Sequence, residues 1–282
     1  MHPLLDPFLS EQLMSEPLTC YAADFEIPQL RRCVFDLTSI DWSRSRGIAA
    51  GYDGYTWKIR IRGHNRPYAL KLNRTQVLVN TMPPNESAKT MRYCNLMQAA
   101  VEDVESPPIM INPNPKSKSD ALRNTYMFSQ EGRQAGLPNA NFEPMVITRI
   151  PRMRRCYGWV KINYSTLRTW PQKAQPHPWI DERLVRYVSP GKDHIAIIYE
   201  YIQETENGND PKVVKEVTDF LWRAGFGYSV ASLARNWKNG VLIDLSDIVH
   251  ACGYQWHERW YGPREVDKVL RDDGIGLFNN RV

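Results

Sequence analysis

Alternation of apolar and polar residues marks the first clear element of the chain. Between Trp57 and Ile61, large apolar residues alternate with lysine and arginine, a period of two that predicts a strand with one buried face. Residues 64–67 supply turn formers, and residues 68–72 resume the strand pattern. The sequence therefore predicts a β-hairpin across residues 57–72.

A 3.6-residue spacing of apolar residues follows this hairpin. Residues 83–85 (Pro-Pro-Asn) provide a helix start, and the apolar positions that follow predict a helix ending near Glu105. The next stretch, 106–119, is rich in Pro, Asn, Lys and Ser. This composition predicts a loop.

The second half of the chain combines strands with one further helix. Residues 145–148, 156–162 and 194–202 are rich in β-branched and aromatic residues, which favours strands. Asp210 stands where a helix N-cap would, with Pro211 at the first helical position. The order of elements predicts an α+β fold.

Composition is that of a folded protein, with 42% apolar and 24% charged residues among 282. We expect an N-terminal extension over residues 1–43, a β-rich part over 44–205 and a smaller part over 206–282. The chain has no run of eighteen apolar residues, so we expect no membrane partner. The start at Met1 also lacks the basic and apolar segments of a secretory signal, and we predict a cytoplasmic location.

The five cysteines are widely scattered, with no Cys-x-x-Cys pair and no histidine at metal-ligand spacing. We therefore expect buried or free thiols. We also predict no metal site and no cofactor.

Positive charge is concentrated in one short stretch, although the net charge of +5 is modest. The cations alternate with Tyr157 and Trp159, a pattern that suits phosphates and stacked bases. A solvated strand edge would have the same composition. The residues of this basic strip are Arg149, Arg152, Arg154, Arg155 and Lys161.

One set of residues resembles the nucleotide-binding elements of protein kinases. Gly51 and Gly54 precede a strand, and Lys71 follows Gly54 by seventeen positions, as do the glycine-rich loop and strand lysine of kinases. Glu86, in the predicted helix, corresponds to the glutamate that pairs with that lysine. A structural ion pair between Lys71 and Glu86 is the simpler alternative.

The second part of this resemblance lies near the C-terminus and is incomplete. Asn236 and Asp244 resemble the metal-binding asparagine and aspartate of kinases. However, the position of the catalytic aspartate, five residues before Asn236, is occupied by Ala231, and only 38 residues follow Asp244. We therefore expect a shortened, degenerate kinase-like fold, with a β-rich N-lobe and a reduced helical C-lobe, that does not phosphorylate peptides.

A closer resemblance covers roughly residues 44–262. The strings at 68–71, 156–161, 197–202 and especially 235–246 look like the kinase-like domain of filamentous fungi that is usually labelled kinetochore-subunit-like. Within that group, the chain is similar to the arginine-containing cyclodipeptide synthases of fungal secondary metabolism. This resemblance implies condensation of arginine, taken from arginyl-tRNA, with a second amino acid to give a cyclic dipeptide (diketopiperazine).

Such a synthase needs proximity, a base for the attacking amine and carboxylates for the arginyl guanidinium. Under this hypothesis Lys71 and Glu86 organise the catalytic site, together with Asn236. Asp244 and Asp247 assist deprotonation or hold the guanidinium, and the basic strip binds tRNA. A second acidic cluster could take the arginyl group instead, and the simpler interpretation of it is a solvated helix end; it consists of Glu102, Asp103 and Glu105.

Two other function classes remain open at this point. A non-catalytic pseudokinase-like binding module would dock a protein partner through its aromatic-rich tail, unless these rings are core. The tail consists of Tyr254, Trp256, Trp260 and Tyr261. A small-molecule phosphotransferase would bind magnesium and nucleotide through Lys71, Asn236 and Asp244. The synthase needs aminoacyl-tRNA and no stable protein partner, so ligand preference separates the three.

Overall fold

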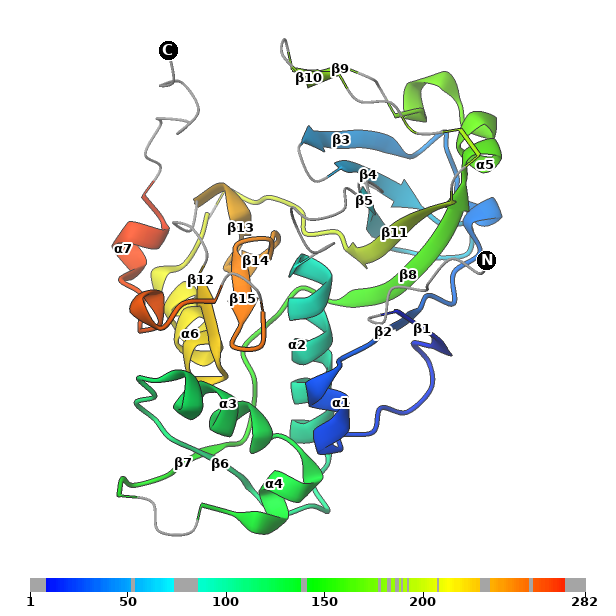
Figure 1. Cartoon of the computed structure of the whole chain (residues 1–282). Helices are drawn as coiled ribbons and strands as arrows, with labels where there is room; N and C mark the ends of the chain where they lie inside the picture. Colours follow the sequence, from blue (N-terminus) through cyan, green and yellow to red (C-terminus); the bar gives the residue numbers. More distant parts are fainter. Residues whose placement is uncertain are drawn as a thin grey trace. The chain divides into compact units, whose positions relative to one another are not determined.

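The computed structural model confirms a mixed α+β chain with a large sheet and several helices (Figure 1). It describes residues 9–51, 54–73, 86–137, 141–176, 179–181, 184–185, 188, 190–191, 193–206, 208–228, 234–253 and 256–271.

Two compact units are formed from interleaved segments of the chain. The first unit contains Met1–Pro17, Gln29–Asn85 and Arg155–Tyr201, and the second contains Leu18–Pro28, Glu86–Arg154 and Ile202–Val282. Residues 1–43, which the sequence suggested as an extension, are thus divided between both units.

Within the described residues, seven strands form the mixed sheet of the first unit (Figure 1). The sheet order is β1 (Leu9–Leu13), β2 (Leu30–Arg32), β8 (Cys156–Asn163), β11 (Asp193–Glu200), β5 (Pro67–Asn73), β4 (Gly54–Arg60) and β3 (Arg46–Gly51). The predicted hairpin is confirmed, because β4 pairs antiparallel with β5. The predicted strands at 156–162 and 194–202 are also confirmed as β8 and β11, which pair antiparallel. A small hairpin of β9 (Trp179–Asp181) and β10 (Leu184–Val185) belongs to the same unit.

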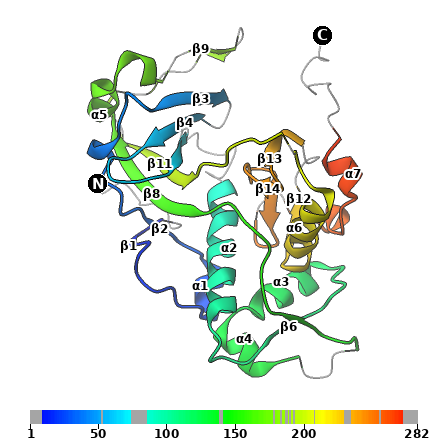
Figure 2. The ribbon, with the colours of Figure 1, turned by 180° about the vertical axis from the view of Figure 1, so that it is seen from behind.

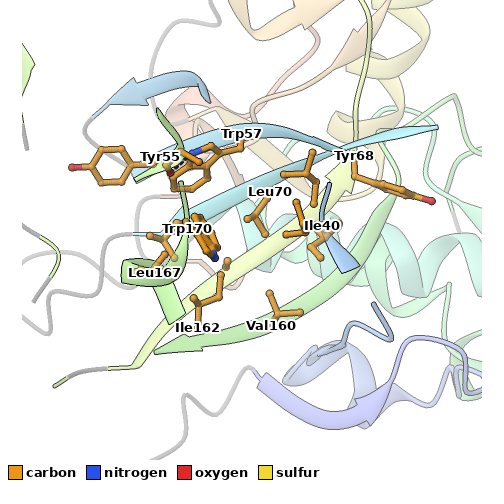
Figure 3. Close-up of a cluster of buried hydrophobic side chains, with 14 of the residues drawn as sticks. Ile40, Tyr55, Trp57, Tyr68, Leu70, Val160, Ile162, Leu167 and Trp170 are labelled. Atoms are coloured by element: carbon orange, nitrogen blue, oxygen red, sulfur yellow. Dashed lines mark hydrogen bonds between the residues drawn. The ribbon is translucent and has the colours of Figure 1, made fainter. Parts of the chain in front are cut away.

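The core of this unit lies on one face of the sheet (Figure 3). Trp57 and Leu70, from the paired strands, pack with Trp170, which follows the short helix α5 (Tyr164–Thr169). The indole Nε1 of Trp57 donates to the carbonyl oxygen of Ala174 at 2.9 Å. The apolar residues that alternate along β4 therefore face this core, as expected. Burial of each such side chain contributes about 1.5–3 kcal/mol.

The second unit is mainly helical, with short strand pairs. Its helices are α1 (Ala22–Glu26), α2 (Glu86–Glu102), α3 (Lys118–Tyr126), α4 (Gln130–Ala135), α6 (Pro211–Arg223) and α7 (Val266–Val269). Its strand pairs are β6 (Ile109–Ile111) with β7 (Met145–Ile147), β12 (Phe226–Tyr228) with β15 (Ile248–His250), and β13 (Trp237–Lys238) with β14 (Val241–Leu242). Helix α1 lies beside α2, as Figures 1 and 2 both show. No helix in the described part of the chain is long and apolar enough to cross a membrane.

Helix α6 is confirmed with its predicted start. The side chain of Asp210 accepts a hydrogen bond from the backbone N–H of Lys212 at 2.9 Å, and Pro211 is the first helical residue. Val214, Val217 and Leu221 are fully buried on one face. Capping and periodicity therefore agree, which is why this helix could be predicted from sequence.

Two predictions in the segment after α2 were wrong. The helix ends at Glu102 rather than Glu105, because Asp103 forms a turn in which its carboxylate accepts from the hydroxyl of Ser106. The predicted loop at 106–119 contains β6 and the start of α3. Ser117 and Asp120 cap α3 reciprocally, a capping box that the loop-like composition obscured.

Gly225 closes the space between α6 and α3. Its φ is +96°, and an added Cβ would lie 2.7 Å from the hydroxyl of Thr125 and 2.8 Å from the carbonyl oxygen of Ala121. Only glycine combines that backbone conformation with so close an approach.

A buried histidine lies next to this contact. His250 Nδ1 accepts from the backbone N–H of Cys252, so Nε2 carries the proton and donates to the hydroxyl of Thr125 at 2.8 Å. The ring stacks on Tyr93 with centroids 3.8 Å apart. Burial lowers the pKa of His250 to about 3, so the imidazole is neutral and structural.

The cysteines are all free thiols. Cys20, Cys33, Cys94 and Cys156 are buried and Cys252 is exposed. Burial raises the pKa of Cys20 and Cys33 to about 11 and that of Cys94 to about 12.

Candidate functional site

The candidate site lies in the second unit, just after the β13–β14 hairpin. Asn239 and Gly240 connect the two strands with φ values of +51° and +73°, the combination that a tight Asn-Gly hairpin turn requires. The side chain of Asn239 also accepts from the hydroxyl of Thr205 at 2.7 Å. The hairpin is therefore fixed at its tip.

Ile243 connects the site residues that the sequence suggested. Its backbone N–H donates to the carbonyl oxygen of Asn236 at 2.7 Å. The side-chain Nδ2 of Asn236 donates to Oδ2 of Asp247 at 3.2 Å. The structure thus brings Asn236 and Asp247 into direct contact across eleven residues of sequence.

Asp244 follows Ile243 directly. Its carboxylate accepts from the backbone N–H of Ser246 at 3.1 Å, which forms a tight turn before β15. Asp244, Asp247 and Asn236 are all half-buried. These side chains therefore stay accessible on backbone that hydrogen bonds hold in place.

Arg154 reaches this loop from a distant part of the sequence. Its Nη1 donates to the carbonyl oxygen of Ile243 at 2.6 Å, over a separation of 89 residues. The guanidinium of Arg154 is thus bonded to the residue that directly precedes Asp244. The sequence had placed Arg154 only in the basic strip.

This arrangement combines two carboxylates, one amide and one guanidinium. Carboxylates accept protons or bind cationic nitrogen, whereas an amide and a guanidinium orient oxygen atoms. In the described residues, no group of three or more His, Cys, Asp or Glu is placed to hold a metal ion.

Lys71 and the glycine-rich segment lie in the first unit. Lys71 is on β5, between Thr56 of β4 and Ile197 of β11, and is half-buried. Gly51 ends β3 and pairs with Gly54, the first residue of β4. Gly54 therefore begins a strand, which agrees with the prediction that these glycines precede one.

Two positions from the kinase-like pattern fall outside the description. Glu86 is the first residue of α2, but its side chain is not among the described ones, so its pairing with Lys71 stays a prediction. Ala231, at the position of the kinase catalytic aspartate, lies outside the described residues.

The acidic cluster after α2 has internal partners. The guanidinium of Arg133, which is 6% exposed, donates to the carbonyl oxygens of Ala100, Asp103, Ser106 and Pro107. Arg133 Nη1 also lies 3.6 Å from the carboxylate of Asp103. The hydroxyl of Ser106 and the charge of Arg133 lower the pKa of Asp103.

Asp103 therefore contacts a guanidinium that belongs to the chain itself. Glu102 and Glu105 are exposed, and Glu102 accepts from Gln98 at 2.8 Å. The sequence did not single out Arg133, because nothing local distinguishes it from a surface arginine on a polar helix.

The basic strip is divided between the two units, with Arg149, Arg152 and Arg154 in the second and Arg155 and Lys161 in the first. Arg149 pairs with Glu216 at 2.7 Å, and Lys161 lies 3.5 Å from Asp193. Arg152 and Arg155 are exposed, whereas Arg154 is half-buried.

The aromatic tail has both buried and exposed rings. Trp256 and Tyr261 are buried together with Trp222, and the hydroxyl of Tyr261 donates to the carbonyl oxygen of Trp222. Trp260 is 54% exposed. Of these three rings, Trp260 is therefore the one that a partner protein could contact. Tyr254 lies outside the described residues.

Comparison with known proteins adds no relative to this description. Neither the scan against protein-family models nor the searches of curated proteins and of solved structures found a match.

Proposed function

We propose that this protein is a tRNA-dependent aminoacyl transferase that builds an arginine-containing cyclic dipeptide on a shortened kinase-like fold. The observation that carries the proposal is the site around Ile243. There, Asn236, Asp244 and Asp247 are held together without the catalytic carboxylate that peptide phosphorylation requires.

The order of elements supports the kinase-like part of the proposal. A glycine-flanked hairpin (β3–β4) precedes Lys71 on β5, and helix α2 follows. Later in the chain, the β13–β14 hairpin leads directly to Asp244. This is the order that the sequence resemblance implies for a kinase-like domain.

The chemistry requires little beyond what the site offers. The α-amine of a second aminoacyl-tRNA attacks the ester carbonyl of arginyl-tRNA; an amide bond forms, and the terminal hydroxyl of the arginine tRNA leaves with a proton. In ring closure, the α-amine of the arginyl residue attacks the ester carbonyl of the second residue, a second amide bond forms, and the hydroxyl of the second tRNA leaves with a proton. Because the ester is already activated, positioning and one proton acceptor suffice.

Of the two acidic clusters, we assign Asp244 and Asp247 to the substrate. Asp103 already contacts Arg133 and Ser106, so an arginyl guanidinium would have to compete with a cation that belongs to the chain. Asp244 and Asp247 are half-buried in the candidate site, where Asn236 contacts Asp247. In this proposal they deprotonate the amine or hold the arginyl guanidinium, while exposed Arg152 and Arg155 bind tRNA.

The deciding experiment is mass spectrometry of small molecules made by the purified protein. The mixture contains tRNA, arginine, the other amino acids, ATP, magnesium and matching synthetases. We expect an RNase-sensitive cyclic arginine dipeptide, and a loss of about 10²-fold or more in Asp244→Asn and Asp247→Asn. The exposed Asp267→Asn is the matched control and should retain activity.

Absence of any cyclic dipeptide, with folded protein and charged tRNA confirmed, would refute the proposal. Phosphorylated small molecules in the same mixture would instead identify a phosphotransferase. Folded protein with neither product would favour the binding-module alternative.

A further inference from the structure

We infer that Arg154 is a positioning residue for the Asp244 loop and not a contact to tRNA. The inference rests on the proposed function where it concerns turnover, and on the geometry alone where it concerns the loop. It separates one member of the basic strip from its neighbours.

Burial and contact distinguish Arg154 from the adjacent cations. Arg152 and Arg155 are exposed, and the guanidinium of Arg152 donates to the carbonyl oxygen of the next residue, Met153, whereas Arg154 is half-buried and donates to the carbonyl oxygen of Ile243, 89 residues away, at 2.6 Å. A guanidinium that holds a distant loop in this way cannot at the same time turn fully toward a phosphate in solvent. The exposed guanidinium groups of Arg152 and Arg155 are better placed to meet a phosphate.

The acceptor is the residue that orders the site. The N–H of Ile243 is bonded to the carbonyl oxygen of Asn236, and its own carbonyl oxygen is bonded to Arg154. Both backbone groups of Ile243 are thereby held by hydrogen bonds. Since the next residue is Asp244, removal of the guanidinium releases the backbone that carries the carboxylate.

Charge assists this role. A donor with a full positive charge makes a shorter and stronger bond than a neutral one, and 2.6 Å is short for an N–H to O contact. Lysine carries the charge but has a single flexible ammonium instead of a planar fork. Arg154→Lys should therefore restore part of the effect that Arg154→Ala removes.

The test compares Arg154→Ala and Arg154→Lys with Arg152→Ala by amide hydrogen exchange. In Arg154→Ala, we expect the amides of Ile243 and Ser246 to exchange at least tenfold faster, with α6 unchanged. Arg154→Lys should give an intermediate rate. Unchanged exchange at Ile243 in Arg154→Ala would overturn the inference; if that variant does not fold, unchanged exchange in Arg154→Lys has the same meaning.

Binding and turnover provide the second measurement. Arg154→Ala should lower kcat about tenfold to a hundredfold, with the tRNA affinity and its salt dependence unchanged. Arg152→Ala should instead weaken tRNA binding and reduce the slope of log affinity against log salt by about one. If Arg154→Ala reduces that slope, Arg154 is an RNA contact and the inference is wrong.

Failure of the two proposals can be told apart. If the wild-type protein makes no cyclic dipeptide, the proposed function fails, while hydrogen exchange still decides whether Arg154 holds the loop.

Discussion

A single buried guanidinium organises the end of helix α2. Arg133 satisfies carbonyl oxygens that follow the helix and contacts the carboxylate of Asp103. We expect Arg133→Met to lower the free energy of unfolding by about 3–5 kcal/mol, because the oxygens stay buried without a donor. Urea titration measures this change.

The exposed Arg123→Ala on α3 is the matched control, with an expected change within about 0.5 kcal/mol. Equal losses in the two variants would show that Arg133 contributes no more than a surface arginine.

His250 makes stability depend on pH. Its pKa is about 3 in the folded protein against an ordinary value of 6.5. Unfolding therefore takes up a proton between these pH values, and stability is complete above pH 6.5 and falls as pH decreases. The expected slope from this residue is up to about 1.4 kcal/mol per pH unit.

Urea titrations of wild-type protein and His250→Gln from pH 7 to pH 4 check this expectation. The variant should lose this part of the slope at a lower overall stability. Parallel curves would mean that other groups cause the acid sensitivity.

Residue roles of this kind were mostly hidden in the sequence. Arg133, His250 and Arg154 bond to groups 26 to 125 residues away, and no local pattern predicts such partners. Asn236 and Asp244 were proposed as site residues because the sequence around them was interpreted as kinase-like, and that interpretation stays a prediction.

At the scale of elements, the approach of α3 to α6 depends on Gly225. We expect Gly225→Ala to destabilise the protein by roughly 2–4 kcal/mol, because it combines a strained backbone with a clash against Thr125 and Ala121. Gly136→Ala is the matched control. Its φ is also positive, at +64°, but nothing lies within 4 Å of the added Cβ.

Thermal unfolding of both variants separates strain from crowding. Gly136→Ala should cost about 1–3 kcal/mol from backbone strain alone, because its φ of +64° and ψ of −159° are adopted almost only by glycine. A similar cost in both would mean that α3 moves aside freely.

The N-cap of α6 gives a smaller and more local effect. Asp210→Ala should cost about 1 kcal/mol, because the N–H of Lys212 loses its acceptor. Asp210→Ser keeps an acceptor and should recover most of this loss in urea titrations. If Asp210→Ala and Asp210→Ser are equally destabilised, the hydrogen bond is not the cause.

Periodicity and capping predicted β4, β5, β8, β11 and α6, because each has a local pattern that its packing then uses. The segment 106–119 was missed because β6 is short and its composition is that of a loop. Its strand character comes from pairing with β7, more than thirty residues later.

Each of the two units is built from segments that are far apart in the sequence. A fragment of the chain therefore lacks part of the unit to which it belongs. Residues 206–282 contain α6, β12 and β15, but β15 is bonded to α2 through Thr90 and to α3 through Thr125. We therefore expect the isolated fragment 206–282 to be largely unfolded.

Circular dichroism and a proton–nitrogen correlation spectrum of the fragment check this prediction. Dispersed signals matching those of the full chain would show that the fragment folds without α2 and α3.

The candidate site was predictable only in part at this scale. The sequence brought together Asn236, Asp244 and Asp247, whose contacts lie within eleven residues. It could not assign Arg154 to them or Arg133 to Asp103, because those pairings depend on the tertiary fold. The roles of Lys71 and Glu86 remain predictions.

The buried cysteines allow the opening of each unit to be measured in the unmodified protein. A thiol reacts as its thiolate, so a buried cysteine is labelled only when its surroundings open. Cys33 and Cys156 belong to the first unit, and Cys20 and Cys94 to the second. Pulse alkylation read by mass spectrometry would therefore time the opening of each unit separately. One shared labelling rate would mean that both units open in a single step, and two rates that each opens independently.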